Sequence, residues 1–113
     1  MIFDRHDVVV VPFPFTDRDI KLRRPAVVLS DKHFAERTGQ HLLAMITRAE
    51  RSTWPGDLPV GNASAAGLGR PSVIRLKLFT LVTPLILDRL GRLARADARA
   101  LAETLADHLG LPG

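Results

Sequence analysis

Short apolar runs separated by turn residues make up most of the chain, and this pattern predicts a strand-rich protein. The run Val8–Val11 carries the strongest signal, because four β-branched residues pack well on a pleated surface and resist helix formation. Pro12 and Pro14 follow this run and are expected to end regular strand pairing. The expected strands cover residues 8–11, 25–29, 41–47, 58–60, 71–82 and 90–93.

The longest of these strands, 71–82, alternates in polarity. Ile74, Leu76 and Leu78 are expected to face the core, and Arg75 and Lys77 to point outward. One face of this strand is therefore predicted to be basic.

Helical spacing dominates only near the end of the chain. Residues 97–109 are predicted to form a helix that Gly110 stops, since glycine is favoured just past a helix C-terminus. Its apolar stripe is expected to pack on the core, with part of it at a dimer interface, and consists of Ala98, Leu101, Ala102, Leu105 and Leu109.

A second, shorter helical segment is predicted over residues 31–37. Ser30 or Asp31 is suited to cap its first turn, and Gly39 to break it. Phe34 is expected to anchor this segment to the core.

The expected elements define a mainly β fold, or β-rich α+β, of five to six strands and one terminal helix. Such a series favours a small, partly open antiparallel barrel with a C-terminal helix. A chain of 113 residues with 46% apolar content is large enough for one core, so a single domain over 1–113 is expected.

Charge and cysteine content narrow the chemistry. The chain has 16 Lys and Arg against 12 Asp and Glu, a balance that favours polyanionic partners. It has no cysteine, which excludes disulfides, zinc–thiolate sites and thiol nucleophiles. It shows neither a leader-like N-terminus nor a spanning apolar segment, so a cytoplasmic location without membrane contact is expected.

Arg24 is the main candidate for chemistry. It precedes Pro25, and a residue before proline is restricted to extended conformations, which would hold its guanidinium at the mouth of the sheet. A guanidinium placed there can grip a phosphate through two parallel hydrogen bonds. The alternative is a structural ion pair with Asp7, Asp17 or Asp19.

Two connections are candidate binding loops. One is the charged segment 16–22, for which a solvated turn is an equal alternative, and the other is the long polar stretch 48–70, which contains Trp54. Phe15 and Trp54 are suited to stack on bases, although Trp54 would equally cover the end of the core.

Six short motifs follow one another along the chain: DVVVVPFPFTD at 7–17, RRPAVVLS at 23–30, IT at 46–47, AGL at 66–68, PSV at 71–73 and LGRL at 90–93. As an ordered set they resemble the MazF/PemK-type toxins of bacterial toxin–antitoxin pairs, over almost the whole chain. The resemblance implies an SH3-like barrel with a C-terminal helix, usually a homodimer. It also implies a metal-independent endoribonuclease without cofactor that cuts single-stranded RNA, including mRNA, and is silenced by a cognate antitoxin with an acidic tail.

The resemblance assigns catalysis to Arg24, before the proline of the second strand, and to Thr47, at the end of the next long strand. RNA carries its own nucleophile, the 2′-OH, so positioning and charge stabilisation suffice. Arg24 would meet the negative charge that builds on the phosphate, and Thr47 Oγ would donate a hydrogen bond to it. The implied products are a 2′,3′-cyclic phosphate or 3′-phosphate and a 5′-hydroxyl.

The remaining candidate RNA contacts are Phe15, Thr16, Asp17, Arg18, Lys21, Arg23, Arg48, Trp54, Arg75 and Lys77. For Arg75 and Lys77 a role in solubility is an equal alternative. Without the resemblance, Thr47 would be expected to be an ordinary threonine at the end of a strand.

Three histidines are weaker candidates for a catalytic role than Arg24 and Thr47. His6 stands where members of this family commonly have the glycine of a Gly-Asp pair; it is expected to be a surface residue, with proton transfer as the alternative. His33 and His41 are general bases by chemistry, but solvated or helix-edge roles are expected for them.

Two other functions compete with RNA cleavage. CcdB-like toxins share the implied fold and poison gyrase through a tryptophan-containing C-terminal tail, whereas this chain ends Leu109-Gly-Leu-Pro-Gly113. A nucleic-acid-binding barrel without catalysis would use the same basic surface.

Overall fold

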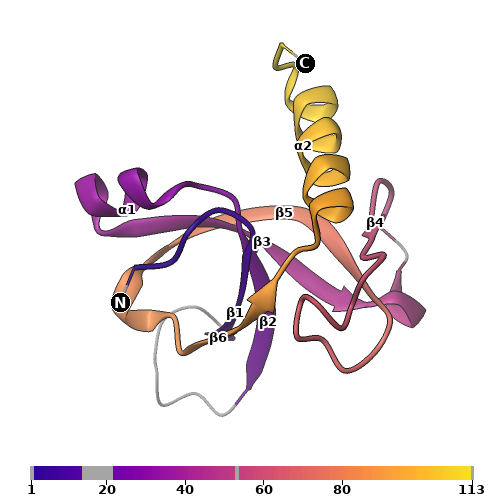
Figure 1. Cartoon of the computed structure of the whole chain (residues 1–113), viewed down its shortest axis with the longest axis horizontal. Coiled ribbons are helices and arrows are strands. Elements are labelled where there is room, and N and C mark those ends of the chain that lie inside the picture. Colours follow the sequence, from indigo (N-terminus) through magenta and orange to yellow (C-terminus); the bar gives the residue numbers. More distant parts are fainter. Residues whose placement is uncertain (1, 14–21, 53, 113) are drawn as a thin grey trace.

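The computed structural model describes residues 2–13, 22–52 and 54–112. Six antiparallel strands form one curled sheet in the order β4-β5-β3-β2-β1-β6, and helix α2 projects from it (Figure 1). The mainly β fold with a C-terminal helix is therefore confirmed. The elements are β1 (Asp7–Pro12), β2 (Arg23–Val28), α1 (Lys32–Thr38), β3 (Gln40–Arg48), β4 (Leu58–Pro59), β5 (Ser72–Val82), β6 (Asp88–Arg92) and α2 (Arg95–Leu109).

The sheet buries apolar side chains on both faces. Helix α2 and the loop between β4 and β5 cover one face, and the N-terminal segment and the segment between β5 and β6 pack on the other. Successive strand residues alternate between these two cores. The core beneath α2 contains Val8, Val27, Ala44, Ile46, Val60, Ala66, Ile74, Leu93 and Leu101. The opposite core contains Phe3, Val9, Val11, Ala26, Val28, Leu43, Leu81 and Ile86.

Helix α1 is capped as the sequence predicts. The Asp31 carboxylate accepts a hydrogen bond from Phe34 N, and Gly39 ends the helix in the left-handed conformation with φ of 72°. The prediction that Phe34 anchors α1 is wrong, since this ring is exposed and the buried residue of the helix is Ala35. Helix α1 thus packs on the rest of the protein through the face that carries Ala35.

Strand β5 departs from the simple alternation that was expected. Ala44 pairs with Leu78 while the next residue, Met45, pairs with Arg75, so β5 carries two extra residues at this point. Such an irregularity bends a strand locally. Leu78, which borders it, has 36% of its surface exposed, so its predicted place in the core is wrong.

The solvated or helix-edge role expected for His41 is also wrong, because its side chain is fully buried. It lies in β3 opposite Leu81, with its ring packed edge-on against Phe3 at a centroid distance of 5.7 Å. Burial lowers the pKa of His41, an effect partly offset by the negative charge of Asp7. His33 is exposed, as expected.

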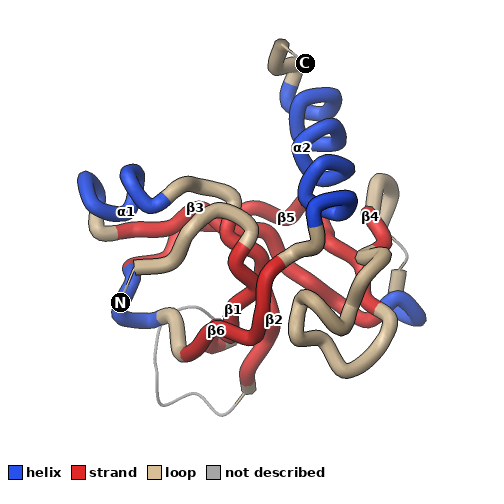
Figure 2. The backbone as a smooth tube through the Cα atoms, viewed as in Figure 1, coloured by secondary structure: helices blue, strands red, loops and turns tan. Residues whose placement is uncertain are grey.

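Three of the five residues of the α2 stripe pack on the core. Leu101 is buried, Ala98 and Leu105 are partly buried, and Ala102 and Leu109 are exposed. The helix leaves the sheet at an angle, so its C-terminal end extends away from the body (Figures 1 and 2). Within the described ranges, no helix combines the length and apolar character needed to cross a membrane.

Candidate functional site

The candidate site lies where β2 and β3 separate. The last ladder pair between these strands joins Ala26 to Met45, and two residues further along each strand stand Arg24 and Thr47. Residues opposite each other in an antiparallel pair share a face, as do residues two apart on one strand. Arg24 and Thr47 therefore belong to the same face of the sheet, just past the point where pairing stops.

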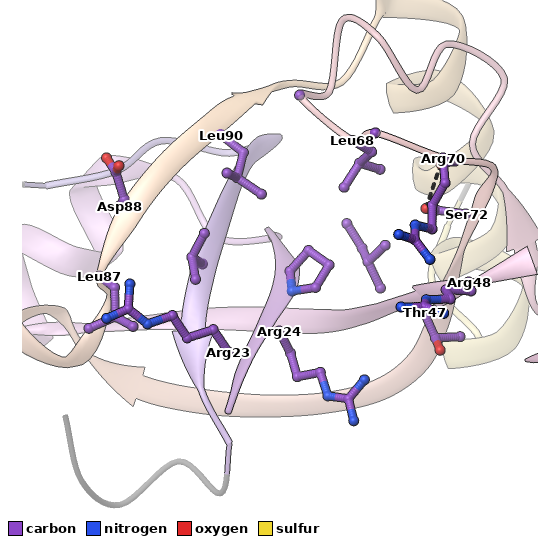
Figure 3. A pocket seen from close by; sticks show the side chains of 15 residues that line it. Arg23, Arg24, Thr47, Arg48, Leu68, Arg70, Ser72, Leu87, Asp88 and Leu90 are labelled. Atoms are coloured by element: carbon purple, nitrogen blue, oxygen red, sulfur yellow. Dashed lines mark hydrogen bonds between the residues drawn. The ribbon is translucent and has the colours of Figure 1, made fainter. Parts of the chain in front are cut away.

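A cavity of about 590 Å³ opens beside this point (Figure 3). Among the described residues, four arginines contribute to its walls, namely Arg23, Arg24, Arg48 and Arg70, against one acidic residue, Asp88. Its lining is completed by Val10, Pro25, Ile46, Thr47, Gly67, Leu68, Gly69, Ser72, Leu87 and Leu90. The surplus of cations suits an anionic ligand with more than one charged group.

A second cavity, of about 320 Å³, adjoins the first. Arg24, Ile46 and Thr47 line both, so these residues form the wall that the cavities share. The rest of its lining is Phe13, Met45, Arg51, Arg75, Lys77, Leu78 and Phe79. An extended ligand passing from one cavity to the other would cross Arg24 and Thr47.

Arg24 is half-buried, and its guanidinium carbon lies 5.6 Å from the centroid of the Phe13 ring. Within the described residues it forms no ion pair. Asp7, one of the predicted partners, instead accepts hydrogen bonds from Arg89 Nε at 3.1 Å and Arg92 Nη1 at 3.0 Å. The other two predicted partners, Asp17 and Asp19, lie outside the described residues.

The neighbouring arginines point in different directions. Figure 3 shows the Arg23 side chain directed toward Leu87 and Asp88, and the Arg24 side chain directed away from them. Arg48 Nη1 lies 3.6 Å from Glu50 Oε1, and because both side chains are exposed their attraction is weak in water. Arg24 and Arg48 thus remain available to an incoming anion.

Residues 67–70 form one wall of the first cavity, and glycines at 67 and 91 allow their loop to pack closely against β6. A Cβ atom on Gly91 would lie 2.6 Å from Ala65 O, and a Cβ atom on Gly67 would overlap Leu90 O. Gly67 also has a φ of +73°, a conformation that favours glycine. Arg92 N donates a hydrogen bond to Ala65 O at 3.1 Å. This close backbone packing brings Arg70 to the cavity.

Arg70, Leu68 and Ser72 were not predicted as site residues. Leu68 and Arg70 belong to the stretch 48–70, which was predicted to bind from its length and glycine content, whereas Ser72 begins β5. Nothing local indicates which side chains of that stretch turn toward the site. In Figure 3 Arg70 points toward Arg48 across the cavity. Tertiary packing alone makes it part of the site.

The other predicted contacts are distributed unevenly. Arg23 and Arg48 line the first cavity, and Arg75 and Lys77 the second. Trp54 lines neither cavity but stacks on Arg75. The predicted contacts outside the described residues are Phe15, Thr16, Asp17, Arg18 and Lys21.

His6 lies at the end of β1 remote from Arg24 and lines neither cavity. Its φ is +77°, a left-handed conformation that side chains adopt reluctantly, which is the physical reason a glycine suits this position. Its pKa is lowered by burial and by the positive charges of Arg92 and Arg5. Its expected role as a surface residue holds in part, since its side chain is half-buried.

No group of three or more His, Asp or Glu side chains suited to a metal ion occurs in the part of the chain that the structure describes. The cationic side chains that line the two cavities belong to arginines and Lys77, and the hydroxyl-bearing residues Thr47 and Ser72 stand among them.

The fold and the two joined cavities define a small antiparallel half-barrel protein with a cationic binding site. The chain belongs to the family of PemK-like, MazF-like toxins of type II toxin–antitoxin systems, whose model matches residues 4–109.

Solved structures share this fold at low sequence identity. An endoribonuclease from a mycobacterial species, in complex with its cognate antitoxin, is 19% identical over 99% of this chain and 97% of its own, with a TM-score of 0.76. MazF from Deinococcus radiodurans is 21% identical over 98% and 99%, and Mycobacterium tuberculosis toxin MazF-mt6 is 20% identical over 95% and 99%, both with a TM-score of 0.74. Comparison with curated proteins gives no match.

Proposed function

We propose that this toxin is an endoribonuclease that cleaves single-stranded RNA at the wall between the two cavities. The observation that carries the proposal is the position of Arg24 and Thr47, which line both cavities at once. An RNA strand lying across the two cavities would bring one phosphodiester to these side chains. Endoribonucleases with the same fold support this assignment.

The reaction is attack of the ribose 2′-oxygen on the adjacent phosphorus, with departure of the 5′-oxygen of the next nucleotide. The 2′-OH gives its proton to water, and the departing 5′-oxygen takes a proton from water to become the 5′-hydroxyl. Charge accumulates on the non-bridging phosphate oxygens as the new P–O bond forms. A preorganised donor next to such charge typically contributes about 10²–10³ in rate. Arg24 supplies the positive charge, and Thr47 Oγ donates a hydrogen bond to the same phosphate.

Arg24 acts electrostatically rather than as a proton carrier, because a guanidinium has a pKa above about 12 and stays protonated. The products are a 2′,3′-cyclic phosphate, or the 3′-phosphate formed from it, and a 5′-hydroxyl. Arg23, Arg48 and Arg70 bind the flanking phosphates in the first cavity.

A direct test incubates the purified protein with a long RNA in EDTA and maps the fragment ends. We expect 5′-hydroxyl ends, which polynucleotide kinase labels without prior phosphatase treatment. Arg24→Ala should lower the cleavage rate at least a hundredfold and Thr47→Ala roughly tenfold or more. Arg99→Ala, which removes an exposed arginine of α2, is the matched control and should cleave normally.

Two outcomes contradict this proposal. If Arg24→Ala cleaves as fast as the unaltered protein, the active site lies elsewhere. If RNA is bound but stays intact, the protein is a non-catalytic nucleic-acid-binding barrel.

We also propose that the protein forms a homodimer and that an acidic segment of a cognate antitoxin covers the cationic cavities. Relatives solved as toxin–antitoxin complexes support the partner class. Because attraction between exposed charges is screened by salt, antitoxin affinity should fall as ionic strength rises. An affinity that does not change with salt would contradict binding through these arginines.

A further inference from the structure

Arg75 is held by an internal carboxylate rather than left free for a phosphate. Its Nε lies 3.2 Å from Asp57 Oδ1 and its Nη2 2.9 Å from Asp57 Oδ2, a bidentate pair. Ser52 Oγ donates a further hydrogen bond to Asp57 at 2.9 Å. The side chain of Asp57 is 3% exposed and that of Arg75 is 20% exposed, so solvent screens this pair weakly. The guanidinium is consequently fixed in position.

Trp54 stacks on this fixed guanidinium. The Arg75 Cζ atom lies 5.3 Å from the centroid of the Trp54 ring, within the range of a cation–π contact. Trp54 nevertheless has 44% of its surface exposed. The result is a large aromatic ring held from one side and still open to solvent.

The register of β3 and β5 places this arrangement beside the proposed active site. Thr47 pairs with Val73 and Met45 with Arg75, so Thr47 and Arg75 are diagonal neighbours on one face. Diagonal neighbours on adjacent antiparallel strands are roughly 7–8 Å apart. Arg75 also lines the second cavity together with Arg24, Thr47 and Lys77.

We propose that Trp54 is a stacking platform for one nucleobase of the bound RNA, and that Arg75, fixed by Asp57, is the residue that positions it. Every base has a π-face, so stacking adds affinity without selecting a sequence. Arg51 and Lys77 at the second cavity would meet the phosphate next to the stacked base. This inference rests on the proposed function and assigns the second cavity to one side of the cleaved bond.

Trp54 is the only tryptophan of the chain, which makes its fluorescence a direct readout. The probe is a fluorescein-labelled single-stranded RNA with 2′-fluoro groups throughout, which lacks the nucleophile and cannot be cut. Binding is measured by anisotropy and, with the unlabelled strand, by tryptophan emission. We expect saturable quenching of Trp54, a roughly tenfold to hundredfold higher Kd for Trp54→Ala, and near-normal binding for Trp54→Phe.

Two further variants separate positioning from simple structural support. Arg75→Gln should weaken binding when Trp54 is present but add little in the Trp54→Ala background, because the two side chains act as one unit. Phe34→Ala removes another exposed aromatic ring, on α1 and outside both cavities, and should leave Kd unchanged. Circular dichroism establishes that each variant is folded at the assay temperature.

Anisotropy that shows binding without quenching, together with an unchanged Kd for Trp54→Ala, overturns the platform and leaves RNA binding intact. Additive losses from Arg75→Gln and Trp54→Ala overturn the positioning role of Arg75. A protein that neither binds nor cleaves RNA overturns the proposed function and this inference with it.

Discussion

Replacing Gly91 by alanine tests how the fold builds the cavity. The added Cβ would lie 2.6 Å from Ala65 O and Ala66 C and 2.7 Å from Gly67 N, all of them backbone atoms. An ordinary contact begins at 3.4 Å, so loop and strand must separate by about 0.8 Å. No flexible side chain is available to absorb this shift.

The expected cost has two parts. Forcing extra volume into close packing typically destabilises a protein by about 1–3 kcal/mol, and for a chain of this size Tm should fall by at least about 4 °C. The displaced loop carries Arg70, and a misplacement of about 1 Å can lower a reaction rate roughly a hundredfold. We therefore expect RNA cleavage by Gly91→Ala to fall about tenfold to hundredfold.

Thermal unfolding and a fluorogenic RNA cleavage assay measure both effects. Gly39→Ala is the matched control, because Gly39 has a φ of +72° but no atom within 4 Å of an added Cβ, and it lies at the end of α1. That variant should lose about 1–2 kcal/mol of stability through backbone strain alone and cleave normally. If Gly91→Ala melts and cleaves like the unaltered protein, the loop is not held by this contact.

Three further predictions concern buried polar groups. The lowered pKa of His41 means that the unfolded chain takes up a proton near pH 6.5 that the folded chain excludes, so stability should fall as pH drops below about 6.5, with a slope of at most about 1.4 kcal/mol per pH unit. Denaturant titrations should show a shallower pH dependence for His41→Phe, and an identical one would contradict the assignment. Asp97 accepts hydrogen bonds from Gly61 N at 2.8 Å and Asn62 N at 2.9 Å, so Asp97→Ala should cost about 1.5–3 kcal/mol in urea unfolding, whereas Glu103→Ala on the exposed face of α2 should cost almost nothing. Hydrogen bonds from Arg75 hold the pKa of Asp57 below its ordinary value, so this pair should stabilise the fold above about pH 4 and lose its effect at lower pH. Asp57→Asn should remove that dependence below about pH 4, and an unchanged acid transition would count against the pair.

Local sequence determined the elements themselves. Four β-branched residues ending at Pro12 specify a strand, Asp31 and Gly39 specify both ends of α1, and Pro25 fixes Arg24 in an extended conformation at the start of β2. These signals act through neighbours along the chain, within a few residues, so they are readable without a fold. The ordered motifs around them were enough to predict the family.

Tertiary structure alone decided which side chains meet. Arg75 was predicted on an outward basic face, yet it is bound to Asp57, which is 18 residues away. Leu78 lines the second cavity instead of the core, the partner strands bury His41, and close packing against Gly91 turns the loop of Arg70 over the cavity. Each outcome depends on an atom contributed by a distant segment, and a pattern of apolar and polar positions carries no information on such long-range contacts.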